Sequence, residues 1–350
     1  MIGLGTATPA HRYSQCDCWD AIRAWPGFAR LTTRSQSILQ KVLSDEKSTA
    51  SRYLALEPLS EAFYLTPDAL AARFAQHAPA LATAAATQAL QRAGLTPDTV
   101  DAVLISTCTG YLCPGLTSYV AERLGLRQDV LTLDLVGQGC GAMVPNLQTA
   151  EALLSAGKAK QVLSVALEVC SAAMYLDDDP GVLISACLFG DGASAAVLSN
   201  TPAASGRRVE WITATNRLNP SERNKLRFEQ RGGMLRNVLS KEVPVLAARH
   251  AAVVLKDTLA RAGVKHDDIT AWILHPGGYN VLRALKEKLG LQQKDIQWSA
   301  AVLREYGNLS SASVLFVLDA ALRGGAPSGH WWLTTFGAGF SCHGALLKVD

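Results

Sequence analysis

The chain has 350 residues, of which 49% are hydrophobic, and a formal net charge of +3. Because the charge is small and no long basic block occurs, nucleic acid is not an expected partner. No apolar run approaches the roughly 20 residues that span a bilayer, so membrane insertion is not expected either.

The first ten residues lack both a basic region and a long apolar stretch, so they are expected to form a strand rather than a signal peptide. Residues 11–80 follow and are expected to be mostly helical, with breaks at three prolines. Residues 202–240 contain two prolines, a Gly-Gly pair and several arginines. We expect this segment to connect two halves and to make an excursion towards the entrance of a site.

Several of the cysteines lie inside apolar strands or beside alanine, which is typical of reduced, buried thiols in a cytoplasmic protein. The pairs Cys16/Cys18 and Cys108/Cys113 are spaced C-x-C and C-x4-C, which is not a recognised zinc pattern, so no metal is expected. The eight cysteines are Cys16, Cys18, Cys108, Cys113, Cys140, Cys170, Cys187 and Cys342.

A weak internal repeat organises the chain. Residues 91–106 resemble residues 260–275, an offset of 169, and each copy has a helix ending in Ala-Gly, a polar loop and an apolar strand. The same offset places the strand at 130–135 opposite the segment before Arg304, and the strand from Gln161 opposite His330. We therefore expect an α/β fold of two duplicated βαβ-type halves, residues 1–200 and 201–350, although unduplicated α/β proteins share such a rhythm.

Three chemically active residues stand where strand-like runs give way to glycine-containing turns. They are Cys140 in Gly-Gln-Gly-Cys-Gly, His275 in His-Pro-Gly-Gly and Asn308 in Tyr-Gly-Asn-Leu-Ser-Ser. The repeat places Cys140 and Asn308 at nearly equivalent positions, each expected to begin a helix after a strand. A helix N-terminus and a nearby imidazolium would both lower the pKa of a thiol.

Together these residues can supply a nucleophile, a proton carrier and donors to an oxyanion. Each also has a purely structural explanation. A cysteine can be a small buried thiol, a histidine can cap a strand, and an asparagine is a common helix N-cap. The repeat favours the catalytic interpretation, because it places all three residues at one junction between the halves.

The sequence around these residues resembles the type III polyketide synthases, the chalcone/stilbene synthase-like branch of the thiolase superfamily. The likeness runs over nearly the whole chain, through residues 3–9, 138–140, 188–193, 272–278, 305–312 and 336–339. It implies a thiolase-like fold, in which the two halves form a five-layer αβαβα architecture. It also implies a cytoplasmic homodimer that needs no cofactor and takes an acyl-coenzyme A starter and malonyl-coenzyme A.

The resemblance assigns a role to each of the three residues. Cys140 would carry the starter acyl group as a thioester, and His275 and Asn308 would promote decarboxylation of malonyl-coenzyme A. A Claisen condensation would follow, and a cyclisation to a pyrone or phenolic product. The substrate-binding positions that the resemblance implies are Phe189, Cys108, Cys113, Gly233, Ala338, Lys47 and Ser310.

The chain departs from the family pattern at several of these positions. Ala338 replaces a usual proline, so the loop that shapes the cavity is expected to be looser. Of the basic contacts to coenzyme A phosphates only Lys47 has a clear match, since Gln40 and Leu43 fall where positive charges are usual. Small residues at Cys108 and Cys113 would leave room for a bulky starter or a longer chain.

Two other functions remain open at this point. A chain-initiating β-ketoacyl-acyl carrier protein synthase uses the same three residue types, and a non-catalytic homologue would only bind acyl groups. A papain-like protease is disfavoured, because the surroundings of Cys140 and the duplicated α/β pattern do not match one. The sequence does not identify the starter, the number of malonyl units or the mode of ring closure.

Overall fold

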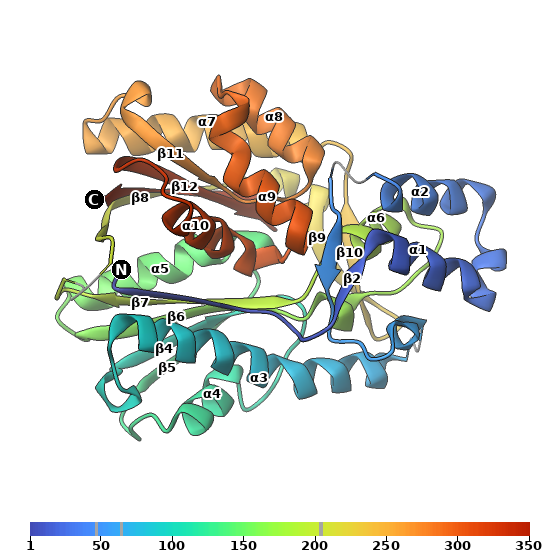
Figure 1. The fold of residues 1–350 in the computed structure, drawn as a ribbon, viewed down its shortest axis with the longest axis horizontal. Helices are drawn as coiled ribbons and strands as arrows, with labels where there is room; N and C mark the ends of the chain where they lie inside the picture. Colours follow the sequence, from blue (N-terminus) through green and yellow to red (C-terminus); the bar gives the residue numbers. More distant parts are fainter. Residues whose placement is uncertain (46–47, 64–65, 203–205) are drawn as a thin grey trace.

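The computed structural model describes residues 1–45, 48–63, 66–202 and 206–350. The predicted phosphate contact, Lys47, lies outside these residues. Two main sheets lie one above the other with helices between and outside them (Figure 1).

The first sheet has the strand order β1-β7-β6-β4-β5. Strands β4, β5 and β6 run parallel, while β7 is antiparallel to both β6 and β1. Its strands are β1 (Gly3–Ala7), β4 (Ala102–Ser106), β5 (Leu131–Leu135), β6 (Gln161–Glu168) and β7 (Gly192–Ser199).

The second sheet has the order β11-β12-β13-β8. Strands β11 and β12 are parallel, and β13 is antiparallel to β12 and to β8. Its strands are β8 (Val209–Leu218), β11 (Ile269–Leu274), β12 (Gly329–Gly337) and β13 (Ser341–Val349).

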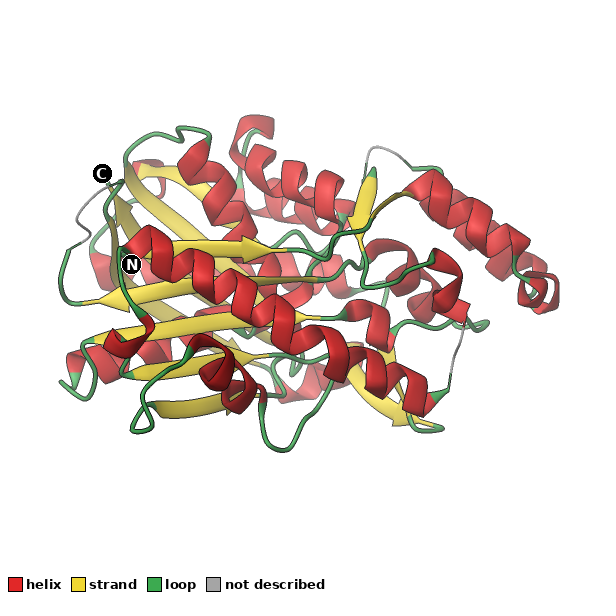
Figure 2. Ribbon diagram, turned by 60° about the horizontal axis from the view of Figure 1, so that its bottom comes forward, coloured by secondary structure: helices red, strands yellow, loops and turns green. Residues whose placement is uncertain are grey.

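Helices form three further layers, so the predicted five-layer α/β architecture is confirmed (Figure 1). α3 (Pro67–Ala93) and α4 (Leu116–Leu124) cover the outer face of the first sheet, where α3 runs along the strands (Figure 2). α5 (Met143–Ser155) and α10 (Ser313–Arg323) lie between the sheets. The outer layer on the second sheet is built from α7 (Val243–Ala262) and α8 (Tyr279–Leu289), with α9 (Gln297–Tyr306) beside α8 and α10.

The internal repeat is confirmed in the strand pairing itself. Ala102 of β4 pairs with Val162 of β6, and 169 residues later Ala271 of β11 pairs with Trp331 of β12. The helices α3 and α7 both end at a left-handed glycine, as the Ala-Gly pattern predicted. The boundary between the halves at residue 200 stays a prediction.

The repeat fails at one predicted strand. The counterpart of the strand predicted at residues 130–135 would be residues 299–304, but these lie inside α9. Their buried side chains, Ser299, Val302 and Leu303, recur at helical spacing. Among the described residues, the second sheet therefore has no counterpart of β5. The prediction that Asn308 follows a strand is wrong, because it follows this helix.

A smaller group of elements lies beside the five layers (Figure 1). The region 11–80 is mostly helical, as predicted, but also contributes a two-stranded ribbon. The segment 202–240 supplies the edge strand β8 and then a hairpin of β9 and β10. The elements of this group are β2 (Arg12–Ser14), α1 (Gln15–Ala24), α2 (Thr33–Leu43), β3 (Ser51–Tyr53), α6 (Pro180–Leu188), β9 (Leu226–Arg231) and β10 (Met234–Leu239).

Short 3-10 turns connect the longer elements. They are η1 (Pro26–Arg30), η2 (Leu59–Phe63), η3 (Pro97–Thr99), η4 (Gly139–Gly141), η5 (Cys170–Ala173), η6 (Pro220–Lys225), η7 (His266–Asp268), η8 (Gln293–Ile296) and η9 (Ser310–Ala312). Within the described ranges, no helix has the length and apolar character that a membrane span requires.

Candidate active site

The three predicted residues line one cavity of about 390 Å³, here called the large cavity. Cys140 comes from η4, which follows β5, and His275 directly follows β11. Asn308 lies between α9 and η9 and forms an isolated β-bridge with Phe189. Residues far apart in the sequence thus converge on one space, as the repeat and the resemblance predicted.

Cys140 does not stand at the first turn of a long helix. It lies in the 3-10 turn η4, and α5 begins only at Met143. Burial raises the pKa of the Cys140 thiol to about 12, although a hydrogen bond with Ser310 acts in the opposite direction. The expectation of a lowered thiol pKa is therefore wrong for this structure, because desolvation of the thiolate outweighs the nearby donors.

His275 is a neutral imidazole in an apolar surrounding. Its side chain is 1% exposed, and burial lowers its pKa to about 3. The ring lies edge-on to Phe336, with centroids 4.9 Å apart. Neither ring nitrogen has a hydrogen-bond partner among the described residues, so both can meet a group that enters the cavity.

Asn308 is held by its carbonyl oxygen. Its Oδ1 accepts hydrogen bonds from the backbone N–H of Ser310 at 2.8 Å and from the hydroxyl of Ser313 at 3.4 Å. The amide nitrogen makes only a long contact of 3.4 Å to the carbonyl oxygen of Gly277. The side chain therefore keeps a donor for a ligand while its acceptor is occupied.

A polar cluster lies next to Cys140. The hydroxyl of Ser310 is 3.2 Å from the Cys140 sulfur and 3.5 Å from the Cys108 sulfur, and it donates to Glu168 at 3.2 Å. Glu168 also accepts hydrogen bonds from the backbone N–H and thiol of Cys108, at 3.0 and 3.2 Å. Ser310 has a φ of 51°, a backbone conformation that is uncommon for a residue with a side chain.

Glu168 is the main site-adjacent residue that the sequence analysis missed. It is fully buried at the end of β6, and burial raises its pKa. A lone carboxylate that ends a run of apolar residues was the available signal. Because its acceptors are filled by hydroxyl, thiol and backbone donors, Glu168 fixes the positions of Ser310 and Cys108.

Phe189 separates the large cavity from a second one. It lines the large cavity and also a neighbouring cavity of about 30 Å³, here called the small cavity. Ser310 lines the small cavity as well, so this space begins beside the Cys140 thiol. The large cavity is also lined by Lys41 of α2 and Lys241 after β10.

Three further predicted substrate contacts, Cys113, Gly233 and Ala338, are not among the described residues that line the two cavities. Cys113 is exposed in the loop after β4, and exposed Gly233 lies in the turn of the hairpin, close to Pro67. Neither of them lines the two cavities among the described residues. Ala338 lies in the turn between β12 and β13 and packs against Gly139, beside Cys140.

No group of three or more His, Cys, Asp or Glu side chains in the described part of the chain is arranged to hold a metal ion. The arrangement around the large cavity instead offers a thiol, a neutral imidazole and an amide donor. Such a set can form a thioester and stabilise an oxyanion.

Two protein-family models match the chain. Residues 30–226 match the model described as FAE1/type III polyketide synthase-like protein. Residues 210–349 match the model of the C-terminal domain of chalcone and stilbene synthases.

Individual relatives cover nearly the full chain. A 1,3,6,8-tetrahydroxynaphthalene synthase of Streptomyces peucetius subsp. caesius is 33% identical over 99% of this chain and 92% of its own. A 3,5-dihydroxyphenylacetyl-CoA synthase of Amycolatopsis balhimycina is 27% identical over 99% of this chain and 92% of its own. The crystal structure of PKS-I from the brown alga Ectocarpus siliculosus has a TM-score of 0.90 at 25% identity, and the match covers 99% of this chain and 97% of that one.

Proposed function

The chain belongs to the type III polyketide synthases, a family of acyl-transferring condensing enzymes that use coenzyme A thioesters, and we propose a specific course for its reaction. Cys140 takes an acyl group from an acyl-coenzyme A starter. The enzyme then extends this group with malonyl-coenzyme A by decarboxylative Claisen condensation, and the chain cyclises to a pyrone or phenolic product. No cofactor takes part.

In the loading step, the Cys140 sulfur attacks the thioester carbonyl carbon and the carbon–sulfur bond to coenzyme A breaks. The thiol proton leaves through neutral His275 and ends on the departing coenzyme A sulfur. A high thiol pKa suits this course, because the proton is transferred during attack rather than before it.

In the extension step, the bond between the malonyl carboxylate and the methylene carbon breaks and carbon dioxide leaves. The electron pair forms a thioester enolate, whose oxygen accepts hydrogen bonds from the Asn308 amide and the His275 ring. The enolate carbon then attacks the acyl carbonyl on Cys140, and the Cys140 sulfur leaves and takes up a proton from water, which restores the thiol. Apolar Phe189 and Phe336 exclude water and favour loss of the malonyl carboxylate.

The observation that carries this proposal is the free donor capacity of two buried side chains beside one thiol. His275 and Asn308 are 1% and 2% exposed, and both line the large cavity with Cys140. Preorganised donors in an apolar site stabilise a developing oxyanion far better than water does.

Two variants test the assignment with malonyl-coenzyme A and a panel of aliphatic and aromatic starters. Cys140→Ala is expected to release no condensation product while it remains folded. Asn308→Asp keeps the acceptor but removes the N–H donor, so decarboxylation should fall at least about 100-fold. Products from Cys140→Ala would refute the nucleophile, and activity only with malonyl-carrier protein would favour a carrier-dependent synthase.

We also propose that the chain acts as a homodimer in the cytoplasm. Edge strand β5 bears exposed Leu131, and Val136 follows it, with exposed fractions of 43% and 63%. Tyr111, in the loop after β4, is 79% exposed. Such an apolar edge is a pairing surface for a second copy. All eight cysteines are free, which supports a reducing compartment.

A further inference from the structure

The hairpin of β9 and β10 forms part of the wall of both cavities. Its ends, Leu226 and Leu239, line the large cavity, while Phe228 and Asn237 line the small one. Helix α6 faces both cavities too, and it ends next to Phe189. The distance between this hairpin and α6 therefore sets the width of the space on both sides of Phe189.

The hairpin has little support from its own backbone. β9 and β10 pair only with each other in the described chain and form a separate two-stranded sheet. Isolated two-stranded hairpins are marginally stable in water. Contacts with α6, which include a hydrogen bond from the Asn237 amide to the Ser185 hydroxyl at 2.8 Å, and contacts with the turns η5 and η6 therefore help to hold it in place.

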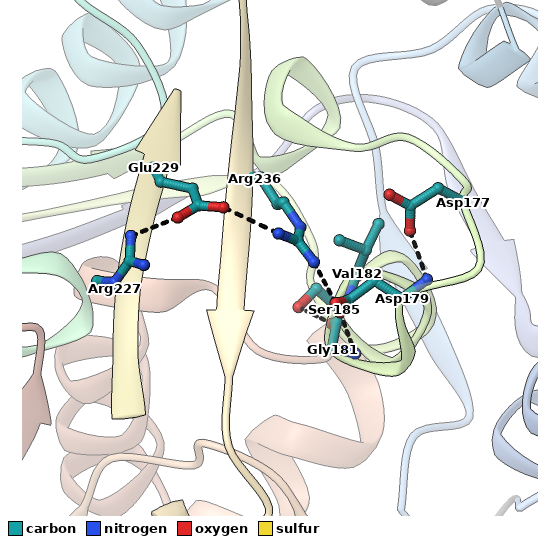
Figure 3. Close-up of polar contacts among 8 residues, drawn as sticks. All are labelled: Asp177, Asp179, Gly181, Val182, Ser185, Arg227, Glu229 and Arg236. Carbon is teal, nitrogen blue, oxygen red and sulfur yellow. Dashed lines mark hydrogen bonds and ion pairs between the residues drawn. The ribbon is translucent and has the colours of Figure 1, made fainter. Parts of the chain in front are cut away.

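Arg236 provides such a contact. Its guanidinium bonds Glu229, the cross-strand neighbour on β9, at 2.9 Å, and it also bonds Asp179 at the start of α6. Arg227 bonds the other oxygen of Glu229 at 2.7 Å, so a line of alternating charges runs from β9 across β10 to α6 (Figure 3). The Arg236 side chain is only 18% exposed.

Asp179 links this line to the helix itself. Its Oδ1 accepts hydrogen bonds from the backbone N–H groups of Gly181 and Val182, at 2.8 and 3.2 Å, and so caps α6, while Oδ2 bonds Arg236. Close packing reinforces the link, because a Cβ atom on Gly181 would lie only 3.2 Å from the backbone nitrogen of Leu239.

We propose that Arg236 is a positioning residue that ties the β9–β10 hairpin to α6 and thereby limits the length of the polyketide. The inference rests on the proposed function of the large cavity. The small cavity measures about 30 Å³ against about 390 Å³ for the large cavity, so it is too small for an extended acyl chain. Growth past Phe189 requires the hairpin to move away from α6, which the bond between Arg236 and Asp179 opposes.

Arg236→Met tests this role, because methionine retains an unbranched stem without charge. Arg227→Met is the matched control, since it removes a charge from the same hairpin and from the same partner, Glu229, but leaves Asp179 bound. We expect the ratio of longer to shorter products to rise at least threefold in Arg236→Met and to change less than 1.5-fold in the control. The first condensation should keep its kcat within twofold in both variants.

Asp179→Asn provides a second approach that does not depend on how well Arg236→Met folds. Asparagine still caps α6, but it cannot pair with the guanidinium. It should reproduce the shift in product ratio, and the double variant should shift no further than either single one. An unchanged product ratio in Asp179→Asn, or additive shifts in the double variant, would overturn the proposal.

Hydrogen exchange separates this inference from the proposed function. In Arg236→Met and Asp179→Asn, amides of residues 226–241 should exchange at least tenfold faster than in the wild type or in Arg227→Met. If the wild type makes no condensation product, the proposed function fails, and exchange still decides whether Arg236 holds the hairpin. Unchanged exchange in both variants would refute that positioning role.

Discussion

Burial controls the chemistry of the individual site residues. Cys140 and His275 are both held in their neutral forms, with pKa values of about 12 and about 3. A preformed thiolate–imidazolium pair would require the opposite shifts. In the proposed reaction the thiol proton therefore moves only when a thioester is present.

This neutral pair predicts how Cys140 reacts with a simple alkylating agent. Iodoacetamide should modify it about tenfold faster for each pH unit between pH 7 and pH 9, because only the thiolate reacts and its pKa lies well above this range. Mass spectrometry of the peptide that contains Cys140 measures the rate. A plateau between pH 7 and pH 9 would instead indicate a stabilised thiolate.

At the scale of elements, the turn after β12 supports the turn that carries Cys140. A Cβ atom added to Gly337 would lie 2.2 Å from the carbonyl oxygen of Gln138 and 2.5 Å from the backbone nitrogen of Gly141. Ala338 next to it packs against Gly139. These contacts place η4, and with it Cys140, against the end of the second sheet.

Gly337→Ala should therefore damage activity more than stability. The added methyl must displace η4, which costs roughly 1–3 kcal/mol, and it moves the Cys140 sulfur away from its acyl acceptor. We expect a modest loss in melting temperature and at least a tenfold loss in kcat. Ala338→Gly, which only removes a methyl group, is the control, and wild-type kcat in Gly337→Ala would contradict this packing argument.

At the scale of the whole molecule, the buried neutral histidine links stability to pH. The unfolded chain binds a proton at His275 below pH 6.5, whereas the folded chain does not until about pH 3. The stability from neutral His275 is thus present above pH 6.5 and is lost as the pH falls, by up to about 1.4 kcal/mol per pH unit. His343, whose pKa burial lowers to about 4, acts in the same direction.

His275→Gln should therefore be less sensitive to acid than the wild type. Chemical denaturation at pH 7 and at pH 5 measures the free energy of unfolding of both proteins. We expect the free energy of unfolding to change less between pH 7 and pH 5 in the variant than in the wild type, whatever the absolute stability of the variant. An equal difference in both proteins would show that His275 is protonated in the folded state.

Much of the architecture could be predicted from the sequence because it is periodic. The offset of 169 residues correctly aligned Ala102 with Ala271. The family motifs predicted that Cys140, His275 and Asn308 lie in one cavity. The predictions that were wrong or missing concern properties that the tertiary surroundings determine. The pKa of Cys140 reflects desolvation, which no local motif reveals, and Glu168 looks like any carboxylate at the end of a strand.

Strand β5 has no counterpart among the described residues of the second sheet, and this difference between the sheets affects the turn that carries Cys140. In the described chain β5 is paired on one side only, with β4, and Cys140 lies in the turn that it leads into. In a dilute solution of separate protomers, that strand would have one free edge and the turn a less rigid support. For the proposed dimer, specific activity should therefore fall on dilution as its protomers separate, which enzyme assays over a thousandfold concentration range can measure. An activity per protomer that stays constant across the measured dissociation would show that the nucleophile needs no second copy.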